Sequence, residues 1–433
     1  MKTNVAIKKP QPVTHEGGKA SRITAEQELR RTVCACMLFE DSFYENGVSA
    51  ADRIASLVKQ VKPEKVRELA VKARTDMKLR HVPLQLLASL AQNGGLNWRT
   101  VEQVIQRPDE LAELIAIYWK GGKKPLKQAM KKGLAAAFRK FNEYSLAKYN
   151  QDGEIKLRDV LFLCHAKPKD AEQAALWKRL IDGKLEIPDT WEVSLSESGG
   201  QNKKEIWTRL LQEQKLGALA VIRNLRNMLQ AGVNEEQIRQ AIRSMKTDRV
   251  LPYRFIAAAR FAPQFEPELE QAMISCMAGQ EKMTGETIIL VDVSGSMDDT
   301  LSGKSDMTRL DAACGLAILM REIGETVKVY TFSDGLVQVP ARRGFALRDA
   351  IVHSQQHSST QLGLAINALP ASDRLIVITD EQSHDDISRA KAPLAYIVNV
   401  ASYKNGVAYD KFVHVHGWSE SVVDYIREYE KLA

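Results

Sequence analysis

The sequence predicts a protein of two parts, an all-α region followed by an α/β region. Two observations lead to this prediction. From about Thr24 to Ala278 the apolar residues recur at helical spacing, whereas after Gly279 apolar strand-like runs alternate with helical ones. With 433 residues, the chain is long enough to form two or more domains with large cores.

In the first region, apolar residues follow one another three and four positions apart. Examples are Ile54, Leu57 and Val58, and later Leu219, Ile222, Leu225 and Leu229, a face that we expect in the core. Breakers such as Asn93-Gly94-Gly95 and Gly121-Gly122 separate about twelve short helical segments. Such a run predicts stacked helical hairpins, an α-solenoid. A compact bundle is the alternative that the spacing leaves open.

The second region predicts a mostly parallel sheet. Apolar strand-like runs occupy Ile288–Val291, Val327–Phe332, Leu375–Thr379, Tyr396–Val400 and Phe412–Val415. A helical pattern around Leu310–Met320 lies between the first two runs, and another from Ser421 to Leu432 closes the chain. Strands that alternate with helices are typical of a doubly wound, Rossmann-like α/β fold with helices on both faces of the sheet.

The same patterns divide the chain into three segments. We expect a mobile N-terminal tail at residues 1–22, a helical-repeat domain at 23–280 and an α/β domain at 281–433. No apolar run approaches the ~18 residues of a membrane span, and the basic N-terminus lacks the apolar core of a secretory signal. The five cysteines show neither disulfide nor zinc spacing, which indicates reduced thiols and a cytoplasmic protein without membrane contact.

Charge is divided unevenly along the chain. Residues 284–433 carry 14 Lys and Arg against 20 Asp and Glu, whereas residues 1–283 carry 47 against 34. The first region is therefore strongly basic. We expect it to contact an anionic partner, with nucleic acid as the first choice.

Oxygen-bearing side chains follow two of the predicted strands. The run Ile288–Val291 ends in Asp292-Val293-Ser294-Gly295-Ser296, and the run Leu375–Thr379 ends in Asp380. Both carboxylates would lie at the carboxyl edge of one parallel sheet, where α/β folds bind ligands. Thr360 precedes a predicted helix, so its hydroxyl could face the same edge. The all-oxygen set of Asp292, Ser294, Ser296, Thr360 and Asp380 suits a hard divalent cation, Mg²⁺ first.

These residues resemble the metal-ion-dependent adhesion site of von Willebrand factor A domains, with Asp292, Ser294 and Ser296 as its DxSxS element. The resemblance implies that the serines bind the metal directly and the acids directly or through water. It also implies one open coordination position, which a partner's carboxylate or another oxygen ligand fills. The chain departs from the family pattern at Ser358-Ser359, where two glycines are frequent, and has Gln361 rather than Asp, but neither departure removes a ligand. The alternative is a retained fold with an empty site, in which Asp292 caps a helix.

The oxygen set predicts binding rather than hydrolysis, because no positioned base is evident beside it. His384 follows Asp380 closely and is the alternative, as a catalytic base. His414 and His416 are expected to pack or to face solvent rather than to bind metal. We therefore expect that the protein is not an enzyme.

A stretch without acidic residues lies between Ala116 and Asn142. Its apolar residues keep helical spacing, so the cations share the solvent side of a basic helix and form a surface suited to phosphates. Tyr118, Trp119 and Tyr149 could stack on bases or belong to the core. The candidate RNA-binding cations are Lys120, Lys123, Lys124, Lys127, Lys131, Lys132, Arg139, Lys140 and, just beyond, Lys148. The alternative is a solvated helix face without a ligand.

A helical-repeat domain followed by an A domain resembles the Ro autoantigen family of TROVE-domain RNA-binding proteins. The segments that carry the resemblance are Lys148-Tyr149, Arg158–Pro168, Ala220–Met228, Leu251–Ile256, Asp292–Met297 and Gly417-Trp418. The resemblance implies a ring of HEAT-like hairpins closed by the A domain. It also implies that Lys148 and His165 contact RNA, although Asp152 stands between them where a basic residue is frequent.

We therefore predict an RNA-binding scaffold without catalytic activity. The resemblance implies that it binds small structured RNA of the Y RNA kind on its outer basic surface. It further implies that single-stranded RNA ends thread through a central hole, in RNA quality control or degradation with an exoribonuclease partner. Two rival functions stay open. One is a Mg²⁺-dependent protein-interaction module that acts through the A domain, and the other is a metal-dependent nuclease.

Overall fold

The computed structural model describes residues 12–15, 17–35, 47–150, 152–187, 190–197, 202–247, 250, 252–303, 305–401, 403, 405–417 and 421–432. The chain forms two compact units. The helical unit comprises the described residues of 47–276, and the α/β unit combines the described residues of 12–35 with those of 277–432. Within the described residues, no helix is long and apolar enough to cross a membrane.

The helical unit is built from short α-helices and one 3₁₀ turn. They are α2 (Gly47–Val58), α3 (Pro63–Thr75), α4 (His81–Gln92), α5 (Trp98–Val104), α6 (Asp109–Tyr118), α7 (Gln128–Phe138), α8 (Glu143–Tyr149), α9 (Leu157–Cys164), α10 (Ala171–Ile181), α11 (Trp191–Glu197), α12 (Lys203–Gln212), α13 (Ala218–Arg223), α14 (Leu225–Gln230), α15 (Glu235–Ser244), α16 (Pro252–Phe261), η1 (Pro263–Phe265) and α17 (Glu266–Cys276).

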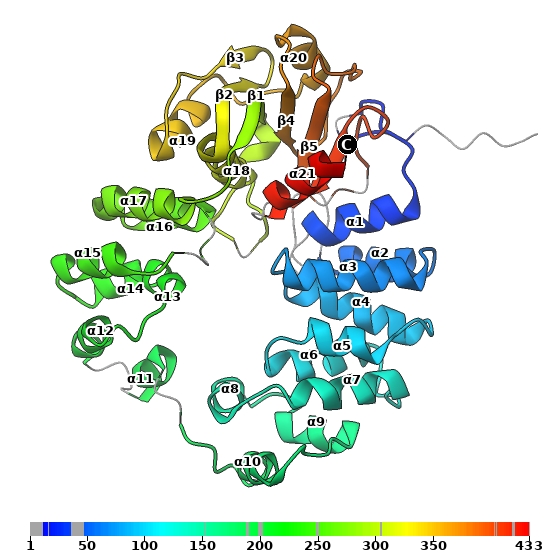
Figure 1. The fold of residues 1–433 in the computed structure, drawn as a ribbon, viewed down its shortest axis with the longest axis vertical. Coiled ribbons are helices and arrows are strands. Elements are labelled where there is room, and N and C mark those ends of the chain that lie inside the picture. The colour runs from blue at the N-terminus through cyan, green and yellow to red at the C-terminus, as the bar shows by residue number, and fades with distance from the viewer. Residues whose placement is uncertain are drawn as a thin grey trace, which may run out of the picture. The chain divides into compact units, whose positions relative to one another are not determined.

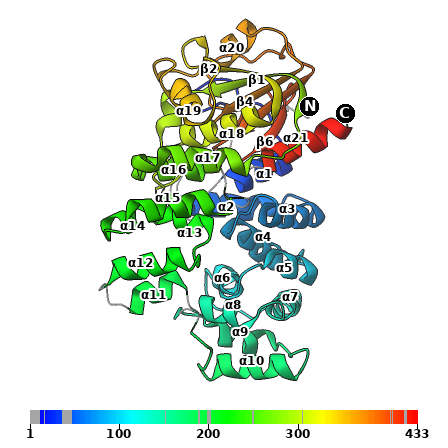
Figure 2. The same ribbon diagram turned by 60° about the vertical axis from the view of Figure 1, so that its left-hand side comes forward.

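Helices two apart along the chain pack on one another in this unit. One layer runs through α3, α5, α7 and α9, and the other through α2, α4 and α6. Figures 1 and 2 both show this succession from α2 to α9. Later helices repeat the pattern, since α15 packs on α13 and α17. Two layers of helices, in each of which every helix packs on the next helix but one along the chain, are the arrangement of a solenoid. The predicted stacking of helical hairpins is therefore confirmed, and the alternative of a compact bundle is not.

The stretch that the sequence predicts as one basic helix is interrupted. Helix α6 ends at Tyr118 and α7 begins at Gln128. The glycines Gly121 and Gly122, the latter with a positive φ of 116°, and then Pro125 lie in the connection of residues 119–127, which interrupts the helix. The predicted cations are therefore divided between a loop and two helices.

The α/β unit contains a six-stranded sheet. Its elements are α1 (Ala25–Ala35), β1 (Met283–Asp292), η2 (Gly295–Asp298), α18 (Arg309–Ile323), β2 (Gly324–Phe332), β3 (Leu336–Gln338), α19 (Gly344–Val352), α20 (Leu362–Ala368), β4 (Arg374–Thr379), β5 (Leu394–Asn399), β6 (Val413–His416) and α21 (Ser421–Leu432). The strand order is β3-β2-β1-β4-β5-β6, and all pairs are parallel except β2 with β3. The predicted α/β fold is thus confirmed. The short antiparallel strand β3 has no counterpart among the predicted strands.

The central strands form the core of this unit. Residues Ile288–Asp292 of β1 and all of β4 are buried, as expected for strands covered on both faces. Helix α18 buries nearly its whole length against the sheet, including Cys314 and Ala317. Because β1 and β4 are parallel neighbours, with Val291 paired to Ile378, their carboxyl ends lie at the same edge.

The N-terminal segment differs from the predicted mobile tail and helical-domain boundary. Residues 1–11 and 16 lie outside the described residues, but 12–15 and 17–22 pack on the α/β unit and α1 follows in the same unit. The physical reason is apolar burial: Ala20, Leu29 and Val33 are at most 1% exposed. The other boundary lies at residue 276 rather than at 280. A smaller correction concerns the predicted core face of α13, because Leu219 is 41% exposed and Val221 is buried instead.

Candidate metal centre and nucleic-acid surface

The two motif aspartates lie at one edge of the sheet. Asp292 is the last residue of β1, and Asp380 directly follows β4. Both carboxylates are fully buried. The hydroxyl of Thr379 donates to Asp292 across the two strands at 2.5 Å, which holds the first carboxylate against the end of the second strand.

Hydrogen bonds connect the acids with the two serines. The Ser294 amide donates to Asp292 at 2.9 Å, which turns the chain directly after β1. The hydroxyls of Ser294 and Ser296 lie 3.4 Å apart, and the Ser296 hydroxyl donates to Asp380 at 2.6 Å. The structure thus places four of the five predicted metal ligands in one continuous cluster of oxygens.

The segment that carries Thr360 lies beside this cluster. The Gly295 amide donates to the Ser358 carbonyl at 3.0 Å, and the His384 amide donates to the Thr360 carbonyl at 3.1 Å. Thr360 itself is 3% exposed. The loop before α20 is therefore tied to the turns that follow both motif strands, which places Thr360 between them.

The electrostatics of the cluster fit a cation. Burial, and secondarily the charge of Asp380, raise the pKa of Asp292 to about 7, so the site holds more negative charge than its surroundings stabilise. Carboxylate and hydroxyl oxygens are the donors that Mg²⁺ accepts. Among the described residues, however, no three His, Cys, Asp or Glu side chains gather as they would around a metal. The two acids are supplemented only by hydroxyls, and the residues fit an ion that keeps several waters.

A buried arginine, absent from the predicted set, reaches the same cluster. Arg309, the first residue of α18, is 2% exposed. Its guanidinium lies 3.9 Å from the Asp380 carboxylate and donates to the Ser296 carbonyl. It supplies part of the positive charge that the two acids require. Its position 13 residues after Ser296 gives no sequence signal of this contact.

The three histidines near the motif are placed differently. His384 is exposed, and its ring nitrogen Nδ1 lies 3.4 Å from the Thr360 carbonyl oxygen. His414 lies 3.2 Å from Glu381 and stacks on Tyr409 at 3.7 Å. His416 is buried, and burial lowers its pKa to about 3. The last two residues pack in the interior, beside the sheet edge.

Glu381, the residue after Asp380, forms a buried ion pair with the N-terminal helix. Its carboxylate lies 2.6 Å from the Arg31 guanidinium on α1, and both side chains are 0% exposed. Although burial alone would raise the pKa of Glu381, the charges of Arg31 and His414 lower it to about 2. Sequence spacing gives no sign of this pair, because its members are 350 positions apart.

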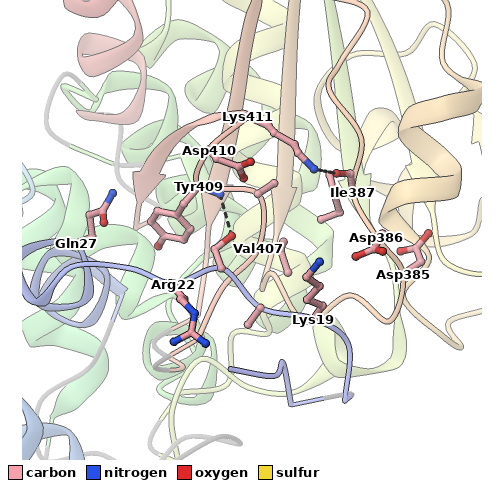
Figure 3. Close-up of a pocket in the computed structure, with 13 residues that line it drawn as sticks. Lys19, Arg22, Gln27, Asp385, Asp386, Ile387, Val407, Tyr409, Asp410 and Lys411 are labelled. Atoms are coloured by element: carbon pink, nitrogen blue, oxygen red, sulfur yellow. Dashed lines mark hydrogen bonds between the residues drawn. The ribbon is translucent and has the colours of Figure 1, made fainter. Parts of the chain in front are cut away.

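A cavity of about 330 Å³ lies next to this region, not at the oxygen cluster. Lys19 and Arg22 of the N-terminal segment line one side, and Asp385, Asp410 and Lys411 lie on the loops after β4 and β5 (Figure 3). The Lys411 ammonium donates to the Ile387 carbonyl at 2.5 Å. The lining carries both signs of charge, so the cavity is polar but has no single ligand preference.

In the helical unit, a tryptophan and two cations meet where α5 packs on α7. The ammonium of Lys132 lies 4.3 Å above the Trp98 ring, and the Arg99 guanidinium lies 5.4 Å from it. Gly133 makes this approach possible, since a Cβ there would lie 2.7 Å from the Trp98 carbonyl oxygen and 2.4 Å from the Val101 Cβ. Trp98 is half-buried, so part of its ring stays accessible.

The loop between α6 and α7 carries four of the predicted cations. Lys120, Lys123, Lys124 and Lys127 are exposed. The Lys124 ammonium lies 4.4 Å from the Tyr118 ring and that of Lys123 lies 5.8 Å from the Trp119 ring. Tyr118 is buried, whereas Trp119 is half-buried. Trp119 therefore keeps a partly accessible ring beside basic groups.

A second basic group surrounds the end of α9. Arg139 donates to the Lys167 carbonyl at 3.0 Å, and the charge of Lys131 acts on Cys164. His165 is exposed and ends α9 in the left-handed conformation, with φ of 51°. One turn earlier Phe162 is 59% exposed. Arg139 and His165 therefore lie at the same end of α9, and the exposed ring of Phe162, absent from the predicted contacts, belongs to the same helix.

Two predicted cations have other partners. Lys140 points its ammonium at the carbonyls of Glu102 and Ile105, which end α5, and burial lowers its pKa. Its prediction as a free RNA contact is corrected, because helix C-terminal carbonyls already bind its charge. Lys148 lies 5.9 Å from the Tyr149 ring, whose other neighbour, Arg107, is 4.4 Å away.

The fold combines two kinds of unit in one chain. An α-solenoid is joined in one chain to a von Willebrand factor A-like α/β unit whose motif acids share one sheet edge. The TROVE domain family matches residues 177–286. The solved structure of the Ro (Rsr) protein of Deinococcus radiodurans superposes with a TM-score of 0.60 at 17% identity, over 93% of this chain and 98% of that one. Residues 177–286 of this chain thus match the TROVE domain family, and the chain as a whole has the fold of the Ro protein.

Curated relatives match a shorter segment. Telomerase protein component 1 of Mus musculus is 35% identical over 92 residues, and that of Rattus norvegicus is 34% identical over 92 residues. The match covers 20% of this chain and 3% of each of these proteins. The likeness is therefore local, whereas the likeness in fold to the Deinococcus protein extends over nearly the whole chain.

Proposed function

We propose that this chain is a non-catalytic RNA-binding protein that holds small structured RNA, of the Y RNA kind, on the helical unit. The main support for this proposal is that cations lie beside accessible aromatic rings on neighbouring helices. Lys132 and Arg99, for example, both lie near the ring of Trp98. Cations bind phosphates, and ring faces accept unpaired bases.

The end of α9 supports binding of a single-stranded portion. Phe162 offers an exposed ring on α9, and Arg139 and His165 place groups that can contact phosphates at the end of the same helix. Stacking on one aromatic ring with nearby cations suits RNA ends without sequence preference. Such binding fits RNA quality control or degradation, with an exoribonuclease as the partner that removes the ends.

We propose further that Asp292, Ser294, Ser296, Thr360 and Asp380 hold Mg²⁺. The raised pKa of Asp292 and the hard oxygen donors support this assignment. The ion would supply a fixed positive charge for an oxygen ligand from a partner. The residues of this chain bury and orient the two carboxylates, through the hydroxyls of Ser296 and Thr379.

The cytoplasm is the compartment that we propose. Cys164 and Cys314 are free and buried, and burial raises the pKa of both thiols, that of Cys164 to about 11. Protonated, buried thiols do not form disulfides readily. Their burial as free thiols fits a reducing environment.

The test of RNA binding is an anisotropy titration of a labelled structured RNA with a single-stranded tail. We expect affinity to fall by about a thousandfold between ~50 and ~200 mM salt, as for six or more phosphate contacts. The double variant Lys131→Glu, Lys132→Glu should weaken binding at least about tenfold. Its matched control is Lys59→Glu, Lys62→Glu, which changes the net charge equally at exposed positions of the connection between α2 and α3. Micromolar, salt-insensitive binding would contradict the proposal.

The Mg²⁺-dependent protein-interaction module is the second candidate, and the oxygen cluster favours it. Asp292→Ala distinguishes the two, because it removes a motif carboxylate without touching the helical unit. Loss of the cellular function in Asp292→Ala, with RNA affinity intact, would favour a protein partner. RNA cleavage by the purified protein with Mg²⁺, lost in Asp380→Ala, would instead establish a nuclease.

A further inference from the structure

The four residues after Asp380 are bound by the N-terminal segment. We name Glu381–His384 the post-Asp380 loop, and the described residues of 12–31 the N-terminal strap. The Thr14 hydroxyl donates to the Ser383 carbonyl at 3.0 Å, and the His15 amide donates to the Gln382 side chain at 2.7 Å. These contacts join residues nearly 370 positions apart within one unit.

Gly18 brings the strap against the loop. A Cβ at Gly18 would lie 2.2 Å from the Ser383 carbonyl oxygen and 2.8 Å from that of His384. The turn is closed on itself, because the Gly18 amide donates to the Thr14 hydroxyl at 2.9 Å. Val13 and Lys19 form an antiparallel bridge around the turn. Only a glycine permits this closeness, so the strap is shaped to fit the loop.

Arg31 holds the first residue of the same loop. Its ion pair with Glu381 is fully buried, and its Nε donates to the Tyr403 carbonyl at 2.5 Å. Glu381 has a positive φ of 63°, a conformation that non-glycine residues adopt rarely. The ion pair with Arg31 therefore holds the chain in a strained turn directly after a motif acid.

The loop contacts the candidate metal ligands on its other side. The Gln382 amide donates to the Asp380 carboxylate at 3.3 Å, while the Gln382 side chain donates to the Asp380 carbonyl at 2.9 Å. The Ser383 hydroxyl and the His384 amide both donate to the Thr360 carbonyl, each at 3.1 Å. Gln382 and Ser383 thus each bind the strap and a candidate ligand at the same time.

We infer that the N-terminal strap is a positioning element of the oxygen cluster, so that docking of the strap and binding of Mg²⁺ strengthen one another. The inference rests on the metal assignment proposed above. The strap does not touch the cation. It fixes the post-Asp380 loop, and through Gln382 and Ser383 it fixes Asp380 and Thr360 in the arrangement that binds the ion.

The seam between strap and loops has room for water. The cavity of about 330 Å³ separates Lys19 and Arg22 from Asp385 and Asp410 (Figure 3). Hydrogen bonds rather than a continuous dry core thus hold this part of the strap. A polar seam can open locally, and a ligand that requires the closed form then shifts the population toward it.

The experiment compares two threonines of the strap in the full chain. Thr14→Val removes the hydroxyl that binds Ser383. The control, Thr24→Val, removes a hydroxyl of the same strap that is hydrogen-bonded to Gln27 in the first turn of α1. In calorimetric titration with MgCl₂, the dissociation constant for Mg²⁺ should be at least fivefold larger for Thr14→Val than for the wild type. It should be unchanged for Thr24→Val. Gly18→Ala should weaken the binding of Mg²⁺ more than Thr14→Val does.

Linkage adds a second readout, because coupling between two sites is reciprocal. Mg²⁺ should slow hydrogen exchange at the His15 and Gly18 amides of the wild-type chain by a factor similar to the affinity loss in Gly18→Ala. RNA affinity, carried by the helical unit, should be equal in all variants, and urea unfolding of each variant serves as the folding control for the α/β unit. Mg²⁺ binding that is equal in wild type, Thr14→Val and Gly18→Ala would overturn the coupling alone. A wild-type chain that binds no Mg²⁺ would overturn the metal assignment together with it.

Discussion

Gly133 on α7 lies directly against Trp98 on α5: a Cβ at Gly133 would come within 2.7 Å of the Trp98 carbonyl oxygen. The main chain of one helix and the side-chain-free face of the other are in contact. This approach also places the neighbouring Lys132 over the Trp98 ring. One glycine therefore serves both the packing of the solenoid and the proposed RNA surface.

We expect Gly133→Ala to lower the free energy of unfolding of the helical unit by ~1–3 kcal/mol, since the added methyl overpacks the contact with Val101. Urea unfolding followed by tryptophan fluorescence measures it, because Trp98, Trp119, Trp177, Trp191 and Trp207 lie in this unit. Gly153→Ala is the control, since its Cβ would meet nothing closer than 3.8 Å. Equal stability of Gly133→Ala and wild type would mean that the two helices separate at little cost.

Lys132 and Lys140 should behave differently although both belong to the basic stretch. Lys132→Ala should weaken RNA binding and lower the magnitude of the salt slope by about 0.9. Lys140→Ala should leave RNA affinity nearly unchanged and reduce stability, because its ammonium binds the carbonyls of Glu102 and Ile105. Anisotropy at several salt concentrations, with urea unfolding of each variant, separates the effects. An equal loss of affinity in both variants would show that Lys140 leaves its carbonyl partners to bind RNA.

Phe162→Ala should weaken binding of a single-stranded RNA tail by ~1–3 kcal/mol if one base stacks on the ring. The side chain is 59% exposed, so its removal should barely affect folding. Ile187→Ala is the control, because Ile187 is 73% exposed and apolar but has no ring face. Titration with a fluorescent single-stranded RNA measures the change. Similar affinities for Phe162→Ala and Ile187→Ala would remove stacking at α9 from the proposal.

Arg309→Gln should bind Mg²⁺ more tightly than wild type, by up to about tenfold. The guanidinium lies 3.9 Å from the Asp380 carboxylate, where it repels an incoming cation. Gln keeps a donor for the Ser296 carbonyl, and Arg321→Gln on the same helix is the control for lost charge. Calorimetry measures the affinities. Weaker binding by Arg309→Gln would contradict this prediction and would mean that the guanidinium charge holds the Asp380 carboxylate in its binding position.

The contribution of His416 to the stability of the α/β unit should be lost on acidification between pH 6.5 and about 3, whereas Asp292, whose folded pKa is raised to about 7, contributes in the opposite direction. Burial lowers the folded pKa of His416 to about 3, so in this window the unfolded chain binds a proton that the native chain does not. His416→Gln should reduce the loss between pH 7.5 and 5.0 by about 2 kcal/mol. Hydrogen exchange of the β5 amides measures it, with exposed His353→Gln as the control. A pH dependence as steep in His416→Gln as in wild type would contradict this assignment.

The sequence by itself determined the order of elements and the fold class. Helical and strand spacing are local properties, and each predicted strand is present in the structure at nearly the predicted residues. The sequence also placed Asp292 and Asp380 at one edge, because residues that end neighbouring parallel strands must lie together. The motif serines follow from the same argument, as they stand on the turn after β1.

Only the tertiary structure decided which side chains are free and which are engaged. Helical spacing cannot show that the Lys140 ammonium binds the carbonyl of Ile105 at the end of α5. This contact exists because α5 and α7 pack on one another at Gly133, although they are not adjacent in sequence. Nor can it show that a polar N-terminal segment is bound, because Thr14 and Arg31 find their partners nearly 370 and 350 residues away. The local sequence pattern determines whether a segment forms a helix or a strand. Burial and long-range pairing depend on the folded chain, and they determine which partner each charged side chain binds.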